Sequence, residues 1–247
     1  MRYILMFFTC GLSFQSIAVD LIFTDNFEPL KPQINDTGIV RAANYPTTNN
    51  VDCSSNIMAQ QDCHQGRDNL FNDNTDGSAG FSFVKLDVTG SVLAANAPDW
   101  KCVKDRVTGL VWEVKIANAA DIHYFGETYR WGGVTHLGVD AGNHYTDWDI
   151  LVNGSNSQSY CGKTNWRIPT AVELIGLVDY SKNGFAIDTN YFPLTESTVY
   201  WTSEPSNDGS SGNNQLGARI VDFDSGGLFV FAFREGTLPV RIVSGGQ

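Results

Sequence analysis

The sequence has few basic residues, and this shortage excludes one class of partner. Lys and Arg number 16 against 27 Asp and Glu, which gives a formal net charge of −11. Nucleic-acid binding requires clustered positive charge, so we expect no nucleic-acid partner. The same acidity opposes tight binding of anionic polysaccharides unless a basic patch or bound cations reverse the local field. Neutral sugars, divalent cations and protein partners are therefore favoured.

Long hydrophobic runs are also scarce, apart from one at the N-terminus. Arg2 precedes the apolar run Tyr3–Leu12, and Ser16 and Ala18 follow as small residues two positions apart. This pattern predicts a signal peptide over 1–18, although a buried first strand is the alternative. The run is about half as long as a membrane span, so the mature chain has no predicted transmembrane anchor. We expect a secreted, periplasmic or cell-surface protein.

Cysteine is scarce as well, with five residues in the chain. Cys10 would leave with the signal peptide, and the remaining four predict two disulfides with three possible pairings. Cys53 and Cys63 lie close together in a polar segment, so we expect them to pair. Cys102 would then pair with Cys161. The spacings do not match those of a zinc site.

Tryptophan is absent from the first 99 residues. Residues 19–80 are dominated by polar side chains and are interpreted as an N-terminal extension, whereas 81–247 contain the large aromatics that usually form a core. Core packing is the favoured role of Trp112, Trp166 and Trp201, with ligand stacking as the alternative.

The pattern within 81–247 predicts an α+β fold, rich in loops, with one or two helices and antiparallel strands. Thr170 and Glu173 form a capping-box sequence before an apolar run, so a helix is expected from Thr170 to about Asp179. Strands are expected in the domain and once in the extension; they are Ile22–Phe27, Phe81–Leu86, Gly109–Val114, Val199–Ser203, Ala218–Asp224, Leu228–Phe233 and Leu238–Val243.

Six short motifs occur in an order that is similar to that of a known family. They are Trp100-Lys101-Cys102, Thr108-Gly109-Leu110-Val111-Trp112-Glu113, Cys161-Gly162, Trp166-Arg167-Ile168-Pro169-Thr170 with Glu173-Leu174, Tyr200-Trp201-Thr202-Ser203 and Val240-Arg241-Ile242-Val243. Over about residues 80–247 the series resembles the Lcl C-terminal domain, a bacterial domain of unknown function named for a collagen-like adhesin. The Arg-Ile-Pro-Thr-x-x-Glu element is also similar to that of formylglycine-generating enzymes and other C-type-lectin-fold proteins.

This resemblance implies a C-type-lectin-like fold, a secreted or surface location, and an adhesive or ligand-binding role. The adhesin that names the family binds sulfated polysaccharides, a ligand that the acidity of this chain opposes. The enzymes with the Arg-Ile-Pro-Thr element use reactive cysteines late in their domain. Since no cysteine follows Cys161, their activity is not expected here. Arg167 and Arg241 are expected to be structural, donating to loop carbonyls or a carboxylate.

Two segments have the composition of a ligand-binding surface. Residues 123–148 are rich in Tyr, Trp, Gly and His, which suits a sugar-stacking surface as well as it suits an ordinary folded loop. Residues 204–208 are faintly similar to the sugar-binding calcium loop of C-type lectins. The ligand-binding candidates are Tyr124, Trp131, His144, Tyr145, Glu204, Asn207 and Asp208.

One polar cluster resembles the first half of a calcium loop, in which alternate oxygen ligands converge on one cation. Its candidate ligands are Asp68, Asn72, Asn74 and Asp76. Phe83 occupies the position of the closing glutamate, and a solvated turn is the favoured alternative. Calcium is the only cofactor that this sequence suggests.

The sequence thus predicts a secreted binding or adhesion module for a glycan or a cell-surface partner, and not an enzyme. It contains no Gly-x-Ser-x-Gly, no phosphate loop and no nucleophile–base pair. Two alternatives stay open. One is an extracellular carbohydrate-active enzyme with Glu204, Asp222 or Asp224 as acid–base groups, and the other is a structural subunit of a surface appendage.

Overall fold

The computed structural model describes residues 35–44, 48–52, 61–62, 66–67, 75–78, 80–132, 147–182, 184–206 and 217–246. The chain divides into two compact units between Gln33 and Ile34, and all described residues belong to the second. The expected signal peptide and the strand Ile22–Phe27 lie outside the described residues. Among the helices described, none has the length and apolar character needed to cross a membrane.

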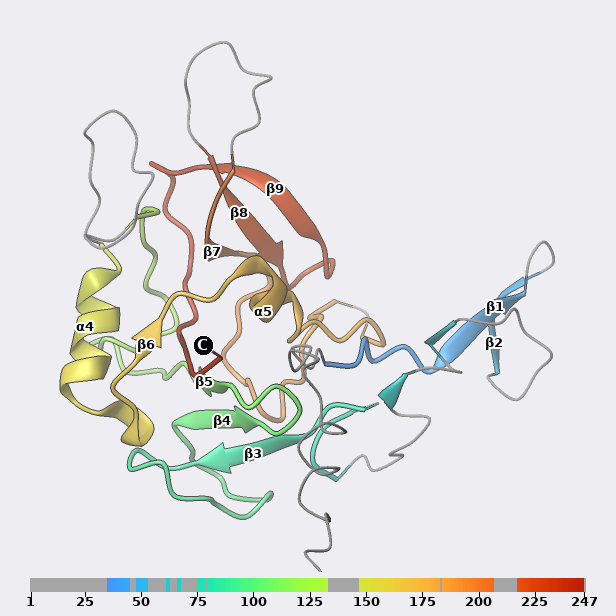
Figure 1. Ribbon diagram of the computed structural model, residues 1–247, viewed down its shortest axis with the longest axis horizontal. Helices are drawn as coiled ribbons and strands as arrows, with labels where there is room; N and C mark the ends of the chain where they lie inside the picture. Colours follow the sequence, from blue (N-terminus) through green and yellow to red (C-terminus); the bar gives the residue numbers. More distant parts are fainter. Residues whose placement is uncertain are drawn as a thin grey trace, which may run out of the picture. The chain divides into compact units, whose positions relative to one another are not determined.

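A five-stranded antiparallel sheet forms one part of the second unit (Figure 1). Its last strand in sequence is inserted between two earlier ones, so the end of the chain joins the sheet's two halves. In spatial order the strands are β3 (Phe83–Leu86), β4 (Cys102–Asp105), β5 (Val111–Glu113), β10 (Val243–Ser244) and β6 (Trp166–Arg167). All four residues of β3 are buried, because both faces of this strand are covered.

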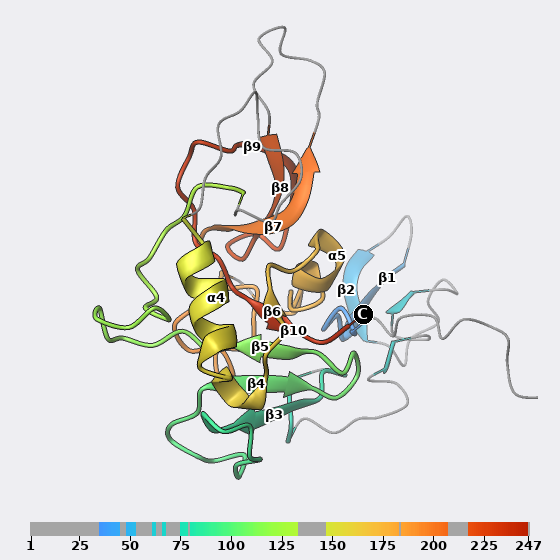
Figure 2. The same ribbon diagram turned by 60° about the vertical axis from the view of Figure 1, so that its left-hand side comes forward.

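A three-stranded antiparallel sheet consists of β7 (Val199–Ser206), β8 (Gly217–Asp222) and β9 (Leu228–Phe233). The strands expected over Ala218–Asp224 and Leu228–Phe233 are present as β8 and β9, and they pair with each other antiparallel as a hairpin. In both views this sheet lies on the side of the five-stranded sheet that carries β6 (Figures 1 and 2).

Part of the expected N-terminal extension is hydrogen-bonded to the domain. The Asn35 side-chain amide donates to Asp105 Oδ2 at 2.6 Å and to the Gly176 carbonyl at 3.1 Å. The extension also forms a short hairpin of β1 (Arg41–Asn44) and β2 (Thr48–Asp52), which the sequence analysis did not predict. The compact unit therefore begins well before the expected boundary at residue 80.

Helix α5 (Ala171–Ile175) has the predicted capping box. The Glu173 amide donates to Thr170 Oγ1 at 3.2 Å, and the Thr170 amide donates to Glu173 Oε2 at 2.8 Å. The predicted end near Asp179 is wrong, because Gly176 caps the helix and Leu177 then bonds three residues back, at 3.1 Å to the Leu174 carbonyl. Glycine has a low helix propensity, and the apolar run continues as turns of this tighter kind.

A second helix, α4 (Asp149–Ser157), buries Leu151 and Ser155. One or two helices were expected, but the place of this second one could not be predicted from the sequence, since Asn, Gly and Ser dominate this segment and have low helix propensity. Asn156 holds Trp166 in β6 by two hydrogen bonds, from Nδ2 to the Trp166 carbonyl at 3.0 Å and from the Trp166 amide to Oδ1 at 2.6 Å. Tertiary contacts thus position this helix.

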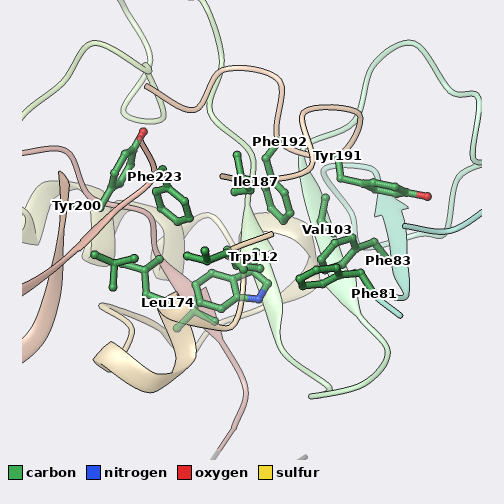
Figure 3. Packing of buried hydrophobic residues seen from close by; sticks show 14 of the residues in the cluster. Phe81, Phe83, Val103, Trp112, Leu174, Ile187, Tyr191, Phe192, Tyr200 and Phe223 are labelled. Atoms are coloured by element: carbon green, nitrogen blue, oxygen red, sulfur yellow. The ribbon is translucent and has the colours of Figure 1, made fainter. Parts of the chain in front are cut away.

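Two clusters of buried side chains form the core. Trp112 belongs to the first cluster, where Figure 3 shows it between the Tyr200–Phe223 pair and the group around Phe83. Trp166 and Trp201 belong to the second cluster. Their exposed fractions are 1%, 2% and 0% for Trp112, Trp166 and Trp201, so the expected core role of the three tryptophans is confirmed.

The expected strand Leu238–Val243 is wrong in its extent, because this stretch bonds to several elements in turn. The Tyr129 amide donates to the Leu238 carbonyl at 2.9 Å, and the Trp201 amide donates to that of Pro239 at 3.1 Å. Only Val243–Ser244 pairs as a strand.

The disulfide Cys102–Cys161 is present and joins β4 to the short 3-10 helix η2 (Tyr160–Gly162), and its two cysteines are 59 positions apart in sequence. This pairing is the predicted one. Cys53 and Cys63 lie outside the described residues, so the second predicted disulfide stays a prediction.

Candidate functional site

A pocket of about 500 Å³ lies beside Trp100, and we call it the Trp100 pocket. Its wall combines two aromatic side chains with groups that donate and accept hydrogen bonds. The lining includes Lys85, Trp100, Lys182, Asp188, Asn190 and Tyr191.

The aromatic side of the Trp100 pocket is held by a cation–π contact and two hydrogen bonds. Lys85 Nζ lies 3.5 Å from the centroid of the Trp100 ring and donates to the Ala97 carbonyl at 3.2 Å. Trp100 Nε1 donates to the Tyr191 carbonyl at 2.9 Å. Burial lowers the pKa of Lys85, and the nearby carboxylate of Asp188 opposes that shift. These contacts hold the indole in one orientation.

The polar side of the pocket is built by a turn that Asp188 organises. Asp188 Oδ1 accepts from the Asn190 amide at 3.0 Å, and the Asp188 carbonyl accepts from the Tyr191 amide at 3.1 Å. Such a side-chain-to-backbone bond stabilises a turn. Asn190 is exposed, whereas the Tyr191 ring packs in the core with its hydroxyl pointing away from the cluster (Figure 3). The pocket therefore presents polar groups on a rigid frame.

Two of the aromatic ligand candidates are described, and they lie in different settings. Tyr124 is half-buried, with its ring 4.9 Å from that of Phe125. Trp131 has an exposed fraction of 0%, and its Nε1 donates to the Thr202 carbonyl at 2.7 Å. Burial gives Trp131 a packing role instead of the ligand-stacking role that the sequence suggested. His144 and Tyr145 lie outside the described residues.

The acidic candidates Glu204, Asp222 and Asp224 accept hydrogen bonds from neighbouring backbone amides and side chains. Glu204 accepts from the Ala171 amide at 3.1 Å and from Arg219 Nη1 at 2.8 Å. Asp222 accepts from the Asp224 amide at 2.8 Å, and Asp224 Oδ1 accepts from a serine hydroxyl in the loop before β7. Asn207 and Asp208 lie outside the described residues.

Of the calcium candidates, only Asp76 is among the described residues; Asp68, Asn72 and Asn74 are not. Asp76 Oδ2 accepts from Ser82 Oγ at 2.5 Å and from Arg106 Nη1 at 3.2 Å. Across the part of the chain that the structure describes, no three His, Cys, Asp or Glu side chains gather as a metal site would require.

A cluster of buried polar side chains consists of Glu113 in β5 together with Lys115, His123 and Arg241. This cluster was not predicted from the sequence. Glu113 Oε1 accepts from Lys115 Nζ at 2.9 Å and from His123 Nδ1 at 2.8 Å. Arg241 Nη1 donates to the Glu113 carbonyl at 2.7 Å, as its expected structural role requires. Burial raises the pKa of Glu113, but Lys115 and His123 outweigh it and hold that pKa at about 2.

A pocket of about 700 Å³ lies on the outer side of this cluster, and we call it the His123 pocket. His123 stacks on Tyr160, with ring centroids 3.8 Å apart, and both side chains line the pocket. Asn118, Asp121 and Gln158 add polar groups to its wall. The one sequence signal for this cluster is the alternation of apolar and charged residues from Trp112 to Lys115, which places Glu113 inside the predicted strand Gly109–Val114 and Lys115 directly after it.

The family model described as the Lcl C-terminal domain matches residues 101–244. The match extends from the start of β4 to the end of β10 and includes His123 and the Asp188 turn. The comparison with curated proteins gives no match, and the comparison with solved structures gives none either.

Proposed function

The chain belongs to the Lcl C-terminal domain family, whose model covers more than half of its 247 residues, and from this premise we propose that it is a glycan-binding adhesion module outside the cell. We infer a C-type-lectin-like fold for the module. The Arg-Ile-Pro-Thr element at the start of α5 and the mixed fold of the described residues, with antiparallel strands and the helices α4 and α5, support this inference.

The Trp100 pocket is the observation that carries the proposal. Sugars present apolar ring faces together with hydroxyl groups that both donate and accept hydrogen bonds. A binding site for them needs aromatic surface beside donors and acceptors in fixed positions. Trp100 and Tyr191 supply the aromatic surface, while Lys182, Asp188 and Asn190 supply the polar groups.

A location outside the cell is supported by the signal-peptide pattern of residues 1–18 and by the disulfide. Disulfides persist in oxidising compartments and are rare in the cytosol. Cys102 and Cys161 have exposed fractions of 0% and 1%, so their bond is enclosed within the core.

Glycan-array binding with three purified proteins tests the proposal. We expect the wild type to bind a glycan, and Asn190→Ala to bind it about tenfold more weakly through loss of one hydrogen bond. Asn153→Ala, at another exposed asparagine, on α4, is the matched control and should bind as the wild type does. Failure to bind any glycan, or equal binding by all three proteins, would overturn the proposal.

A further inference from the structure

Three pockets of the domain adjoin one another, because neighbouring pockets share lining residues. A middle pocket of about 380 Å³ shares Trp100 with the Trp100 pocket. It shares Lys101, Ile116 and Ala117 with the His123 pocket. The three therefore follow one another across the loops before β4 and after β5.

We propose that the three pockets form one groove that holds a linear, uncharged glycan of at least three sugar units. This inference rests on the proposed function and specifies its ligand class. A small-molecule site is typically about 300–1,000 Å³, and the pockets measure about 500, 380 and 700 Å³. Each pocket thus has room for at least one sugar ring.

Backbone hydrogen bonds hold the middle of the groove in place. The Lys101 amide donates to the Leu86 carbonyl at 2.9 Å, and the Lys101 carbonyl accepts from the Val114 amide at 3.0 Å. The Ile116 amide donates to the His123 carbonyl at 3.0 Å. A groove whose floor is preformed in this way loses little conformational entropy when a chain molecule binds.

His123 forms part of the wall at one end of the groove. Its Nδ1 bonds to Glu113 Oε1 at 2.8 Å, and its ring stacks on that of Tyr160 with the centroids 3.8 Å apart. The side chain is only 2% exposed, so it supports the wall of the pocket. The polar groups that line this end of the groove are those of Asn118, Asp121 and Gln158.

The charge of the groove favours an uncharged ligand. Four lysines and three aspartates line it. Lys115 forms a salt bridge of 2.9 Å with the buried Glu113, so three lysines remain to balance the three aspartates. One of these pairs, Lys101 with Asp99, forms a salt bridge of 2.8 Å. This balance contrasts with the net charge of −11 for the whole chain. The groove therefore has no excess of positive charge to attract a polyanion and no excess of negative charge to attract a polycation. The seven residues are Lys85, Lys101, Lys115, Lys182, Asp99, Asp121 and Asp188.

Calorimetric titration with neutral oligosaccharides of two to six units tests the groove, using β-1,4-glucose, β-1,4-N-acetylglucosamine, α-1,4-glucose and β-1,4-mannose as the probe series. In the series that binds, we expect the Kd to fall at least tenfold from the dimer to the hexamer. Gln158→Ala, in the His123 pocket, should raise the Kd of the hexamer about fivefold and leave that of the dimer unchanged. Asn190→Ala should raise both, and Asn153→Ala neither.

The outcomes separate the groove from the proposed function. Equal affinity for the dimer and the hexamer, or a hexamer Kd insensitive to Gln158→Ala, overturns the groove and leaves the Trp100 pocket as a site. No binding in any of the four series, together with no binding on the glycan array, overturns both. As a readout on the intact protein, the side-chain amide ¹⁵N signal of Gln158, which lines the His123 pocket, should shift with the hexamer and not with the dimer. An unchanged signal would also overturn the groove.

Discussion

Glu113 and Glu173 each accept hydrogen bonds from cationic side chains, but they do so in different parts of the fold. Glu113 has an exposed fraction of 0%, and its partners include His123, ten residues away, and Arg241, 128 residues away. Glu173 is half-buried and bonds to Arg167, six residues away, at 2.6 and 2.8 Å. The first cluster joins distant segments, whereas the second mainly organises the start of α5.

The difference shows how burial changes the role of an ion pair. A charge removed from water must be compensated by its partners, so loss of one partner is far more costly than at a half-exposed site. The pair of Arg167 and Glu173, whose side chains are 22% and 17% exposed, should lose less, because water reaches and partly solvates the charge that remains. We therefore expect the buried cluster to respond much more strongly to substitution, acid and loss of a partner.

The largest expected effect is that of Glu113→Ala. The substitution leaves Lys115 buried without its carboxylate and should reduce the free energy of unfolding by about 3–5 kcal/mol. Urea denaturation followed by tryptophan fluorescence measures the change. The double variant Glu113→Leu with Lys115→Met, which removes both charges, should recover part of the loss. If Glu113→Ala reduced the free energy of unfolding by less than about 1 kcal/mol, the expected sensitivity of the buried cluster would be contradicted.

Lowering the pH should destabilise the protein through the same cluster, without any substitution. The pKa of Glu113 falls from its ordinary value of 4.5 to about 2 in the folded protein. A depressed carboxyl pKa contributes stability that is complete above the unfolded value and is lost as the pH falls through the folded one. Between pH 5 and pH 2 the free energy of unfolding should thus decrease by about 3 kcal/mol from this group.

Urea denaturation at several pH values measures this slope, with two variants as controls. Glu113→Gln should flatten the decrease markedly. Glu173→Gln should flatten it less, although the pKa of Glu173 is also lowered, with burial opposed by hydrogen bonds from Arg167 and Thr170. Equal slopes for the wild type and Glu113→Gln would show that the cluster is not the main acid-sensitive element.

The smallest expected effect concerns the capping box. Thr170→Ala removes the acceptor of the Glu173 amide and should reduce the free energy of unfolding by about 1 kcal/mol. Thr170→Ser keeps that acceptor and should remain close to the wild type. Thermal unfolding of the two variants side by side provides the measurement. If Thr170→Ala destabilised the protein as much as Glu113→Ala, the proposed ranking of the two sites would fail.

Features that depend on neighbours in sequence could be predicted. The capping box of Thr170 and Glu173 needs only residues three positions apart, and the β8–β9 hairpin needs only a short turn between two apolar runs. The pairing of Cys102 with Cys161 followed from the small number of cysteines and the assumption that Cys53 pairs with Cys63. The buried role of Trp131 was missed, because composition does not show which side of a loop faces the core.

The candidate site could be predicted only in part, for the same reason. Trp100 was part of a recognised motif, but Lys85, Asp188 and Asn190 come from separate segments and share no spacing. His123 was counted as a loop residue, since nothing near it in sequence indicates that Glu113 and Tyr160 enclose it.

The sequence by itself determined the α+β character, the family, the disulfide of the domain and the start of α5, because each depends on local pattern, residue order or a count. Only the tertiary structure decided which polar side chains share a pocket and which charges are buried. Glu113, His123 and Arg241 meet because β10 is inserted between β5 and β6 and because the loop after β5 folds back and brings His123 to Glu113. Burial is a property of the packed chain, and no single segment carries it.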